Sequence, residues 1–196
     1  EMQLYSDEKK YMAQMHELWE EMDGCTVLIS GATGMVGKCL VETIILHNNY
    51  TENPIRIVAL SRNERKARER LGDCFEDERF DYMSCDVNEG LPELGQIDYV
   101  IHAASNTHPL QYSQDPVGTI TTNVIGTKNL LDYAVTHGAK CFCFVSSVEV
   151  YGENRGDVEK FDENYLGHLD CNTLRAGYPE SKRLGETLCN AYKQMY

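Results

Sequence analysis

The sequence predicts an α/β protein built on a doubly wound, mostly parallel β-sheet. Short apolar runs rich in β-branched residues recur along the chain, most of them are followed by a segment with helical periodicity, and a glycine-rich turn joins the first run to its helix. Strands that alternate with helices form βαβ units, whose helices cover both faces of a parallel sheet. Ligands bind such sheets beyond the carboxyl ends of the strands. The residues that follow each apolar run are therefore the candidates for a functional site.

Five strands are expected from the apolar runs, at 25–30, 55–60, 80–87, 97–105 and 140–147, the third being the weakest. Helical patterns follow at 38–49, 63–71, 115–138 and 179–196. The helix at 115–138 should end at Gly138, because glycine is favoured just past a helix C-terminus.

The N-terminal residues form a separate pattern. A helical stripe over 11–22 aligns Tyr11, Met12, Met15, Leu18, Trp19 and Met22. We expect a helix packed on the outside of the domain, with a partner-binding helix as the alternative. The pattern changes at Gly24, which predicts an N-terminal extension over 1–23 and a domain over 24–196.

Composition limits the class of protein. The chain has 196 residues, enough for one domain, and its 18 basic against 31 acidic residues give a net charge of −13. This acidic balance argues against a nucleic-acid partner, because nothing supplies an extended cationic surface for phosphates. No apolar run approaches the roughly 20 residues that span a bilayer, and the first residues lack a signal-peptide layout. We expect a soluble, cytoplasmic protein without a membrane partner.

The eight cysteines are expected to be buried reduced thiols. They are scattered, with no C-x-x-C pair and no histidine at metal-ligand spacing. Cys141 and Cys143 alternate within one strand and therefore share a face, but no third metal ligand accompanies them. No metal site is predicted.

The glycine turn is the strongest local signal for a binding site. It reads Ser30-Gly-Ala-Thr-Gly-Met-Val-Gly37, between a buried strand and a helix. Gly31 should allow the tight turn, Gly34 the approach of a pyrophosphate to backbone N–H groups, and Gly37 close packing of helix on strand. We predict dinucleotide binding by the turn, with a purely structural turn as the alternative; the binding residues expected here are Gly31, Thr33, Gly34, Met35, Val36 and Gly37.

The residues after the second strand bear on the choice of cofactor. An acidic residue there usually binds the adenosine ribose of NAD, whereas an arginine accommodates the extra phosphate of NADP. This chain has Ser61 and Arg62, with Arg65 and Lys66 nearby. NADP is therefore favoured over NAD. The alternative is that Arg62 caps a solvated basic helix and that NAD binds through other contacts.

Several motifs in order carry a resemblance to a known family. The glycine turn is followed by "CDV" at 85–87, "IHAAS" at 101–105, "SSVEVYG" at 146–152 and "YPESK" at 178–182. From about Cys25 to Tyr196 the chain resembles the extended short-chain dehydrogenase/reductase family, in particular its NAD-dependent epimerase/dehydratase branch, whose members modify nucleotide sugars on a Rossmann-type fold.

The resemblance implies roles for residues after each strand. Asp86 and Val87 would lie at the adenine, Ala103, Ala104 and Ser105 would border the cofactor, and Asn123 would support the active site from the long helix. Ser147, Tyr178 and Lys182 match the catalytic serine, tyrosine and lysine, and Tyr178 and Lys182 would also contact the nicotinamide end of the cofactor.

The chemistry of the tyrosine and lysine can be stated from first principles. Oxidation of a sugar hydroxyl needs a base for the O–H proton while hydride leaves the carbon. Lowering a tyrosine pKa from about 10 to near 7 requires roughly 4 kcal/mol of phenolate stabilisation. Lys182, one helical turn from Tyr178, can supply part of it together with the positive nicotinamide. Taken alone, such a pair would be read as an ordinary surface pair.

Glu149 and its neighbours bear on the reaction. "EVYG" at 149–152 resembles nucleotide-sugar dehydratases and UDP-glucuronate decarboxylases. Dehydratases of the dTDP-glucose type carry an aspartate before that glutamate, where this chain has Val148. The segment 167–192, with Arg175 three positions before the tyrosine, resembles the decarboxylases. Epimerisation, decarboxylation and elimination all begin with oxidation at C4, and Glu149 is either catalytic or a solvated strand-end carboxylate.

Family members continue beyond the position of Tyr196 with a region that binds the nucleotide sugar, so the resemblance implies that this region is missing here. It also implies a homodimer through the helices at 115–138 and 179–196. Two other classes of function remain open: a non-catalytic NAD(P)-binding regulatory domain, and a reductase of a small carbonyl or a thioester-linked substrate.

Overall fold

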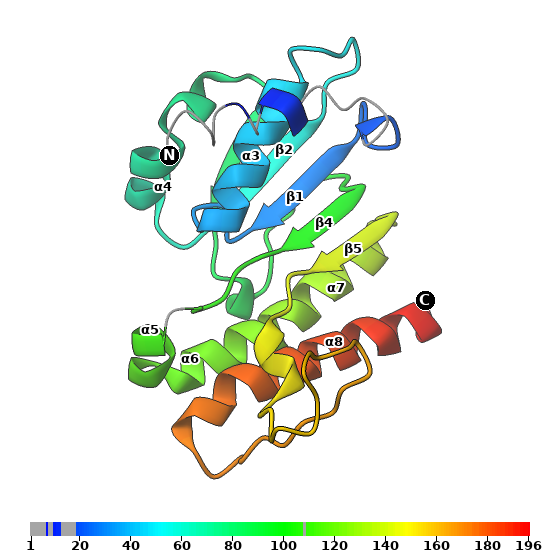
Figure 1. The fold of residues 1–196 in the computed structure, drawn as a ribbon. Coiled ribbons are helices and arrows are strands. Elements are labelled where there is room, and N and C mark those ends of the chain that lie inside the picture. The colour runs from blue at the N-terminus through cyan, green and yellow to red at the C-terminus, as the bar shows by residue number, and fades with distance from the viewer. Residues whose placement is uncertain (1–6, 8–9, 13–18, 108) are drawn as a thin grey trace.

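A computed structural model describes residues 7, 10–12, 19–107 and 109–196. Its centre is a five-stranded sheet in which every strand pair is parallel, in the order β3-β2-β1-β4-β5 (Figure 1). The strands are β1 (Thr26–Ser30), β2 (Arg56–Ser61), β3 (Phe80–Ser84), β4 (Tyr99–His102) and β5 (Cys141–Phe144). The predicted doubly wound α/β fold is confirmed. The direction of winding reverses between β1 and β4, which is where ligands bind in such sheets.

Side chains of successive residues point to opposite faces of the central strands and so build two cores. Val27 and Ile29 of β1 belong to one buried cluster, which also contains Ile57 of β2. Leu28, between them, belongs to the other cluster, with Val58 of β2. Because both faces are covered, these strands are apolar along their whole length rather than alternating.

Two helices cover the first face. Helix α3 (Met35–His47) follows β1, and α4 (Glu64–Leu71) follows β2 (Figure 1). Asn63 caps α4, because its side chain accepts a hydrogen bond of 2.9 Å from the Lys66 backbone N–H. A 3₁₀ helix, η1 (Gly72–Glu76), leads from α4 into β3.

The opposite face carries the long helix, which differs from its prediction. It consists of α6 (Pro116–Thr121), a π-helical segment η3 (Thr122–Gly126) and α7 (Thr127–Thr136), with Gly138 at a φ of 67° past its end. A further short helix, α5 (Pro109–Gln114), precedes Asp115. A π-helical turn makes the backbone of a helix bulge locally, and such turns are frequent at functional sites. Here it contains Asn123.

Helix α8 (Gly177–Met195) packs against this long helix and β5. In the described part of the chain, neither α8 nor any other helix is long and apolar enough to cross a membrane. Between β5 and α8 lie two 3₁₀ helices, η4 (Val148–Tyr151) and η5 (Leu174–Ala176), joined by a loop. Arg183 of α8 holds this loop by donating to the Val150 carbonyl at 2.6 Å and to the Gly167 carbonyl at 2.9 Å.

The predicted N-terminal stripe is confirmed only in part. Trp19 is helical, buried in the first core and stacked on the His47 ring, and Met22 packs against the same core from a turn rather than from a helix. Tyr11 and Met12 are helical but exposed. The other two members of the stripe, Met15 and Leu18, lie outside the described residues.

The expectation of buried cysteines is confirmed only for Cys25 and Cys74, since three others are partly exposed and three are exposed. All eight are free thiols, but Cys141, Cys143 and Cys171 are exposed. Cys141 and Cys143 share one face of β5, as predicted, and that face is exposed because β5 is an edge strand paired only with β4. Cys171 lies in the exposed loop that precedes η5.

Candidate functional site

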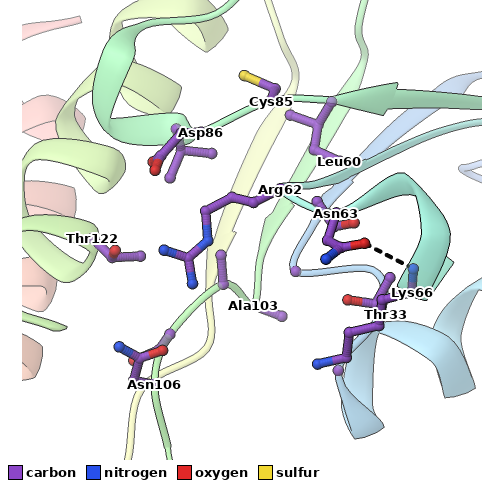
Figure 2. Close-up of a pocket in the computed structure, with 16 residues that line it drawn as sticks. Thr33, Leu60, Arg62, Asn63, Lys66, Cys85, Asp86, Ala103, Asn106 and Thr122 are labelled. Atoms are coloured by element: carbon purple, nitrogen blue, oxygen red, sulfur yellow. Dashed lines mark hydrogen bonds between the residues drawn. The ribbon is translucent and has the colours of Figure 1, made fainter. Parts of the chain in front are cut away.

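A cavity of about 250 Å³ opens at the carboxyl edge of the sheet, beyond the ends of the neighbouring strands β1 and β4. Most of its walls come from residues at or just after the ends of four strands, and Lys66 and Thr122 add to them from helices, as Figure 2 shows. The lining residues are Gly31, Thr33, Gly34, Leu60, Ser61, Arg62, Asn63, Lys66, Cys85, Asp86, Val87, Ala103, Ala104, Ser105, Asn106 and Thr122. The cavity lies where the fold predicts a ligand site.

The glycine turn forms one wall of the cavity and has little room for side chains. Gly31 has a φ of 71°, and a Cβ on it would lie 2.6 Å from the Ala104 backbone nitrogen. A Cβ on Gly37 would lie 2.4 Å from the Gly31 carbonyl oxygen, so this glycine lets α3 pack directly on the turn. The tight turn and the close helix packing predicted for these two positions are both present.

The remaining residues of the turn divide into two groups. Thr33 and Gly34 line the cavity. Met35 and Val36 do not, and their side chains are exposed. They are the first residues of α3, where backbone N–H groups lack intrahelical partners, so any contribution they make to a ligand comes from the main chain.

Arg62 and Lys66 bring positive charge to the opposite wall. Figure 2 shows the Arg62 side chain projecting across the cavity from the end of β2. Within the described residues, neither cation takes part in an ion pair, whereas Arg65 lies 3.9 Å from Glu69 and outside the cavity. Arg62 does not cap α4, since Asn63 does so. Two unpaired cations beside a glycine turn suit an anionic ligand.

The predicted residues after β3 and β4 also reach the cavity. The Asp86 carboxylate accepts a hydrogen bond of 2.9 Å from the Asn88 backbone N–H and caps η2 (Val87–Glu89). Val87 is buried, and Ala103 and Ala104 line the cavity with Ser105. The Ser105 hydroxyl is buried and lacks a hydrogen-bond partner in the described part of the chain. Such a group is available to a ligand or a water molecule.

Sequence reasoning missed some of the lining residues. Leu60, Asn63, Cys85, Asn106 and Thr122 were not predicted at the site. Cys85 immediately follows β3, and Leu60, Asn63 and Asn106 lie within four residues of the end of a strand, a position that could have indicated them. Thr122 had no such signal, because it reaches the cavity from the π-helical segment.

The reactive groups lie at the start of η4 and on α8, outside the lining of the cavity. Tyr178 and Lys182 are both buried, and Lys182 Nζ donates a hydrogen bond of 2.7 Å to the Val145 carbonyl. Ser147 caps η4 by accepting from the Glu149 backbone N–H at 3.2 Å, and its side chain lies close enough to Tyr178 to lower the pKa of that phenol. The structure therefore brings the predicted serine, tyrosine and lysine together.

A ring that sequence analysis did not single out packs on Tyr178. Tyr112 of α5 is buried and stacks on the Tyr178 ring with centroids 5.2 Å apart and an interplanar angle of 12°. No periodicity in the sequence relates two residues on different helices so far apart. The stack fixes the plane of the Tyr178 phenol.

Asn123 supports α8 rather than the cavity. It is fully buried, and its side-chain nitrogen donates to the Ser181 hydroxyl at 2.9 Å. That hydroxyl in turn donates to the Tyr178 carbonyl at 2.8 Å. Ser181 lies between the tyrosine and the lysine, so Asn123 fixes the segment of α8 that carries both.

Burial opposes charge on both reactive groups. Burial raises the pKa of Tyr178, and Glu149 and Tyr112 raise it further, whereas the interaction with the Ser147 side chain lowers it. Burial lowers the pKa of Lys182 to about 8, against the effect of Glu186. The groups of the protein alone therefore do not give Tyr178 the lowered pKa expected from sequence, because desolvation disfavours the phenolate.

Glu149 has a partner of opposite charge. Its carboxylate lies 3.5 Å from an Arg175 guanidinium nitrogen, and the Arg175 side chain is 74% exposed. The preceding residue, Val148, is exposed. The pair joins η4 to the segment that enters α8.

The parallel sheet, the glycine turn and the cavity at the switch point define a Rossmann-type α/β domain. The family model for the NAD dependent epimerase/dehydratase family matches residues 27–196. The chain therefore belongs to that family.

Individual relatives agree with this assignment. UDP-glucuronic acid decarboxylase 1 of Danio rerio is 33% identical over 172 residues, which are 88% of this chain and 38% of that protein. UDP-glucuronic acid decarboxylase 3 of Arabidopsis thaliana is 34% identical over 170 residues, 87% of this chain and 47% of that protein. This chain thus spans less than half of the curated relatives it matches.

Solved structures show the same fold. The UDP-Glc/GlcNAc 4-epimerase of Campylobacter jejuni superposes with a TM-score of 0.70 at 21% identity, over 87% of this chain and 50% of that one. The epimerase Mth375 of Methanothermobacter thermautotrophicus has a TM-score of 0.71 at 21% identity, over 92% of this chain and 51% of that one. At this identity the likeness shows the fold alone.

The glycine turn generates a test of stability. Gly31→Ala should lower the free energy of unfolding by about 3 kcal/mol or more, because strain from a positive φ adds to a clash with backbone. Gly156→Ala is the matched control: its φ is 83°, but an added Cβ meets nothing within 4 Å. It should cost only about 1–2 kcal/mol. Urea denaturation measures both, and equal losses would contradict the close packing of the turn on Ala104.

Proposed function

We propose that the protein is an NAD(P)-dependent enzyme that oxidises a nucleotide sugar at C4 to a 4-keto intermediate. Epimerisation, decarboxylation or elimination then follows. The observation that carries the proposal is the convergence of Ser147, Tyr178 and Lys182 beside a cavity built around a glycine turn.

The residues of the cavity suit a dinucleotide. Gly31 has no room for a Cβ, which keeps the turn tight, and Gly34 lines the cavity, where backbone N–H groups could approach a pyrophosphate. Arg62 and Lys66, which form no ion pair within the described residues, offer positive charge. Bound NAD(P)⁺ would accept a hydride from the sugar. Glycine-turn residues would hold the phosphates, while Asp86, Val87 and the 103–105 segment would border the adenosine and the ring beyond it.

The protein's own groups would then handle the proton. Tyr178 would accept it from the sugar hydroxyl, Ser147 would hydrogen-bond to the same oxygen, and Lys182 would stabilise the phenolate. A cation favours the charged form of a neighbouring acid. Lys182 Nζ lies 6.0 Å from the centre of the Tyr178 ring, on the side of the helix that faces β5.

The relatives favour decarboxylation for the second step. The curated relatives at 31–34% identity are UDP-glucuronic acid decarboxylases. Among the structural neighbours, one Bacillus cereus enzyme is a UDP-glucuronic acid 4-epimerase solved with a UDP-sugar analogue and NAD. We propose Glu149 as the group that acts on the substrate after oxidation, with Arg175 beside it. Val148 in place of an aspartate disfavours dehydration of the dTDP-glucose type.

We also propose a homodimer and a cytoplasmic location, both of which the sequence analysis expects, and one surface feature supports the homodimer. An open apolar groove lies between the long helix and α8, lined by Ile120, Val124 and Leu184 among others. Val117 is exposed on the same helix. Two such faces would bury one another across a twofold axis.

Turnover tests the proposed reaction. The protein should convert at least one member of a panel of UDP-, dTDP-, CDP- and GDP-sugars, followed by mass spectrometry. Tyr178→Phe should lower kcat roughly 10²–10⁴-fold because the base is lost, while dinucleotide affinity changes little. Tyr50→Phe, a partly exposed tyrosine outside the site, is the control. Failure to convert any sugar would sink the proposal and favour a regulatory domain or a reductase of another carbonyl.

The choice of cofactor is tested at Arg62. We favour NADP, so Arg62→Ala should weaken NADP binding roughly 10- to 100-fold, through loss of a charge-assisted phosphate contact, and leave NAD binding nearly unchanged. Arg65→Ala should change neither, since Arg65 pairs with Glu69. Calorimetric titration with both dinucleotides gives the affinities. An equal effect on NAD and NADP would contradict a phosphate contact at Arg62.

A further inference from the structure

The residues that leave β5 contact α8 one after another. Val145 accepts the hydrogen bond from Lys182 through its carbonyl, and the Ser147 side chain lies near Tyr178 and lowers its pKa. Between them, the Ser146 hydroxyl donates to the Glu186 carboxylate at 2.5 Å. Positions 178, 182 and 186 are four residues apart, so they follow one another along one face of the helix. Sequence analysis identified the first two members of this row and not the third.

Phe144 sets how closely this face approaches the strand. A Cβ on Gly185 would lie 2.4 Å from the Phe144 ring, so the ring packs on the helix backbone at that glycine. Lys182 Nζ lies 4.5 Å from the centre of the same ring. The amine is thus held between an aromatic face and a backbone carbonyl, and Lys182 as a whole is only 2% exposed.

The charges around Lys182 are few. On α8 itself the neighbours are Tyr178 and Glu186, and β5 contributes a ring and a carbonyl rather than a charge. From β4, His102 is kept neutral, because burial and the lysine's own charge lower its pKa to about 3. Glu149 of η4 acts on Tyr178. In the described residues, the carboxylate of Glu186 is the charge that raises the pKa of Lys182.

We propose that Glu186, fixed by Ser146, is a positioning residue that keeps Lys182 protonated beside Tyr178. The inference rests on the proposed catalytic role of Lys182. A buried ammonium is costly without a compensating charge, and the carboxylate one turn along the helix offsets part of that cost by raising the pKa of Lys182. Ser146 holds the carboxylate on the side of the helix that faces β5.

Direct titration of Lys182 tests this without any substrate. The ¹³Cε signal of Lys182, assigned by its loss in Lys182→Met, is followed by NMR in the ¹³C-lysine-labelled protein as pH rises. Glu186→Gln should lower the pKa of Lys182 by about one unit, because the negative charge that raises this pKa is removed. Glu180→Gln is the matched control: Glu180 lies on the same helix and pairs with Arg183 instead. Its effect should be below about 0.2 unit.

Two further variants separate charge from position. Glu186→Asp keeps the charge and should recover at least half of the shift, whereas Ser146→Ala frees the carboxylate and should lower the Lys182 pKa by roughly half as much as Glu186→Gln. If Glu186→Gln does not fold, Ser146→Ala decides the matter alone. An unchanged Lys182 pKa in the folded variants overturns the proposal.

The pH dependence of turnover supplies a second readout. Loss of the Lys182 charge should define the basic limb of the kcat profile, and Glu186→Gln should move that limb to lower pH by the same shift as the NMR titration. A uniform fall in kcat with the limb in place would mean that Glu186 merely fastens the helix, and would overturn the proposal. If no sugar is converted, the proposed function fails while the NMR titration still tests Glu186.

Discussion

The packing of α8 on the residues that leave β5 is the constraint on which the reactive centre depends. Phe144 lies against Gly185, and this close approach places the Lys182 amine within hydrogen-bonding distance of the Val145 carbonyl. The same approach excludes water from the tyrosine and the lysine. Burial then raises the pKa of the tyrosine and lowers that of the lysine, so the protein alone disfavours the phenolate that the proposed base needs. The proposed chemistry therefore requires positive charge that arrives with the cofactor.

The sheet and the long helix hold this centre beside the cavity. Parallel strands end at one edge, so residues far apart in the sequence meet there, from Gly31 after β1 to Thr122 beyond β4. The π-helical segment that contains Asn123 ties the long helix to α8 through Ser181. One irregular turn of helix thus serves both parts of the site, since Thr122 lines the cavity and Asn123 supports the reactive face.

Sequence reasoning could predict what local patterns encode. Apolar runs and helical periodicity are enough to predict the order of strands and helices. A glycine turn between a strand and a helix points to dinucleotide binding, because such a turn has few other functions. The resemblance to a family located Ser147, Tyr178 and Lys182. Contacts between distant elements were beyond reach: Tyr112 stacks on a residue of another helix, and Glu186 meets Ser146 across the strand–helix contact. A π-helical segment hardly alters the helical periodicity, and the exposure of Cys143 depends on β5 being an edge strand.

The most direct measurement is the pKa of Tyr178, with and without bound oxidised dinucleotide. The difference in tyrosinate absorbance between the protein and Tyr178→Phe isolates this one residue among the others. The structure predicts a pKa above that of free tyrosine in the protein alone, and a fall of about two units or more when the positive nicotinamide ring binds. A Tyr178 pKa that does not move on dinucleotide binding would contradict its assignment as the base.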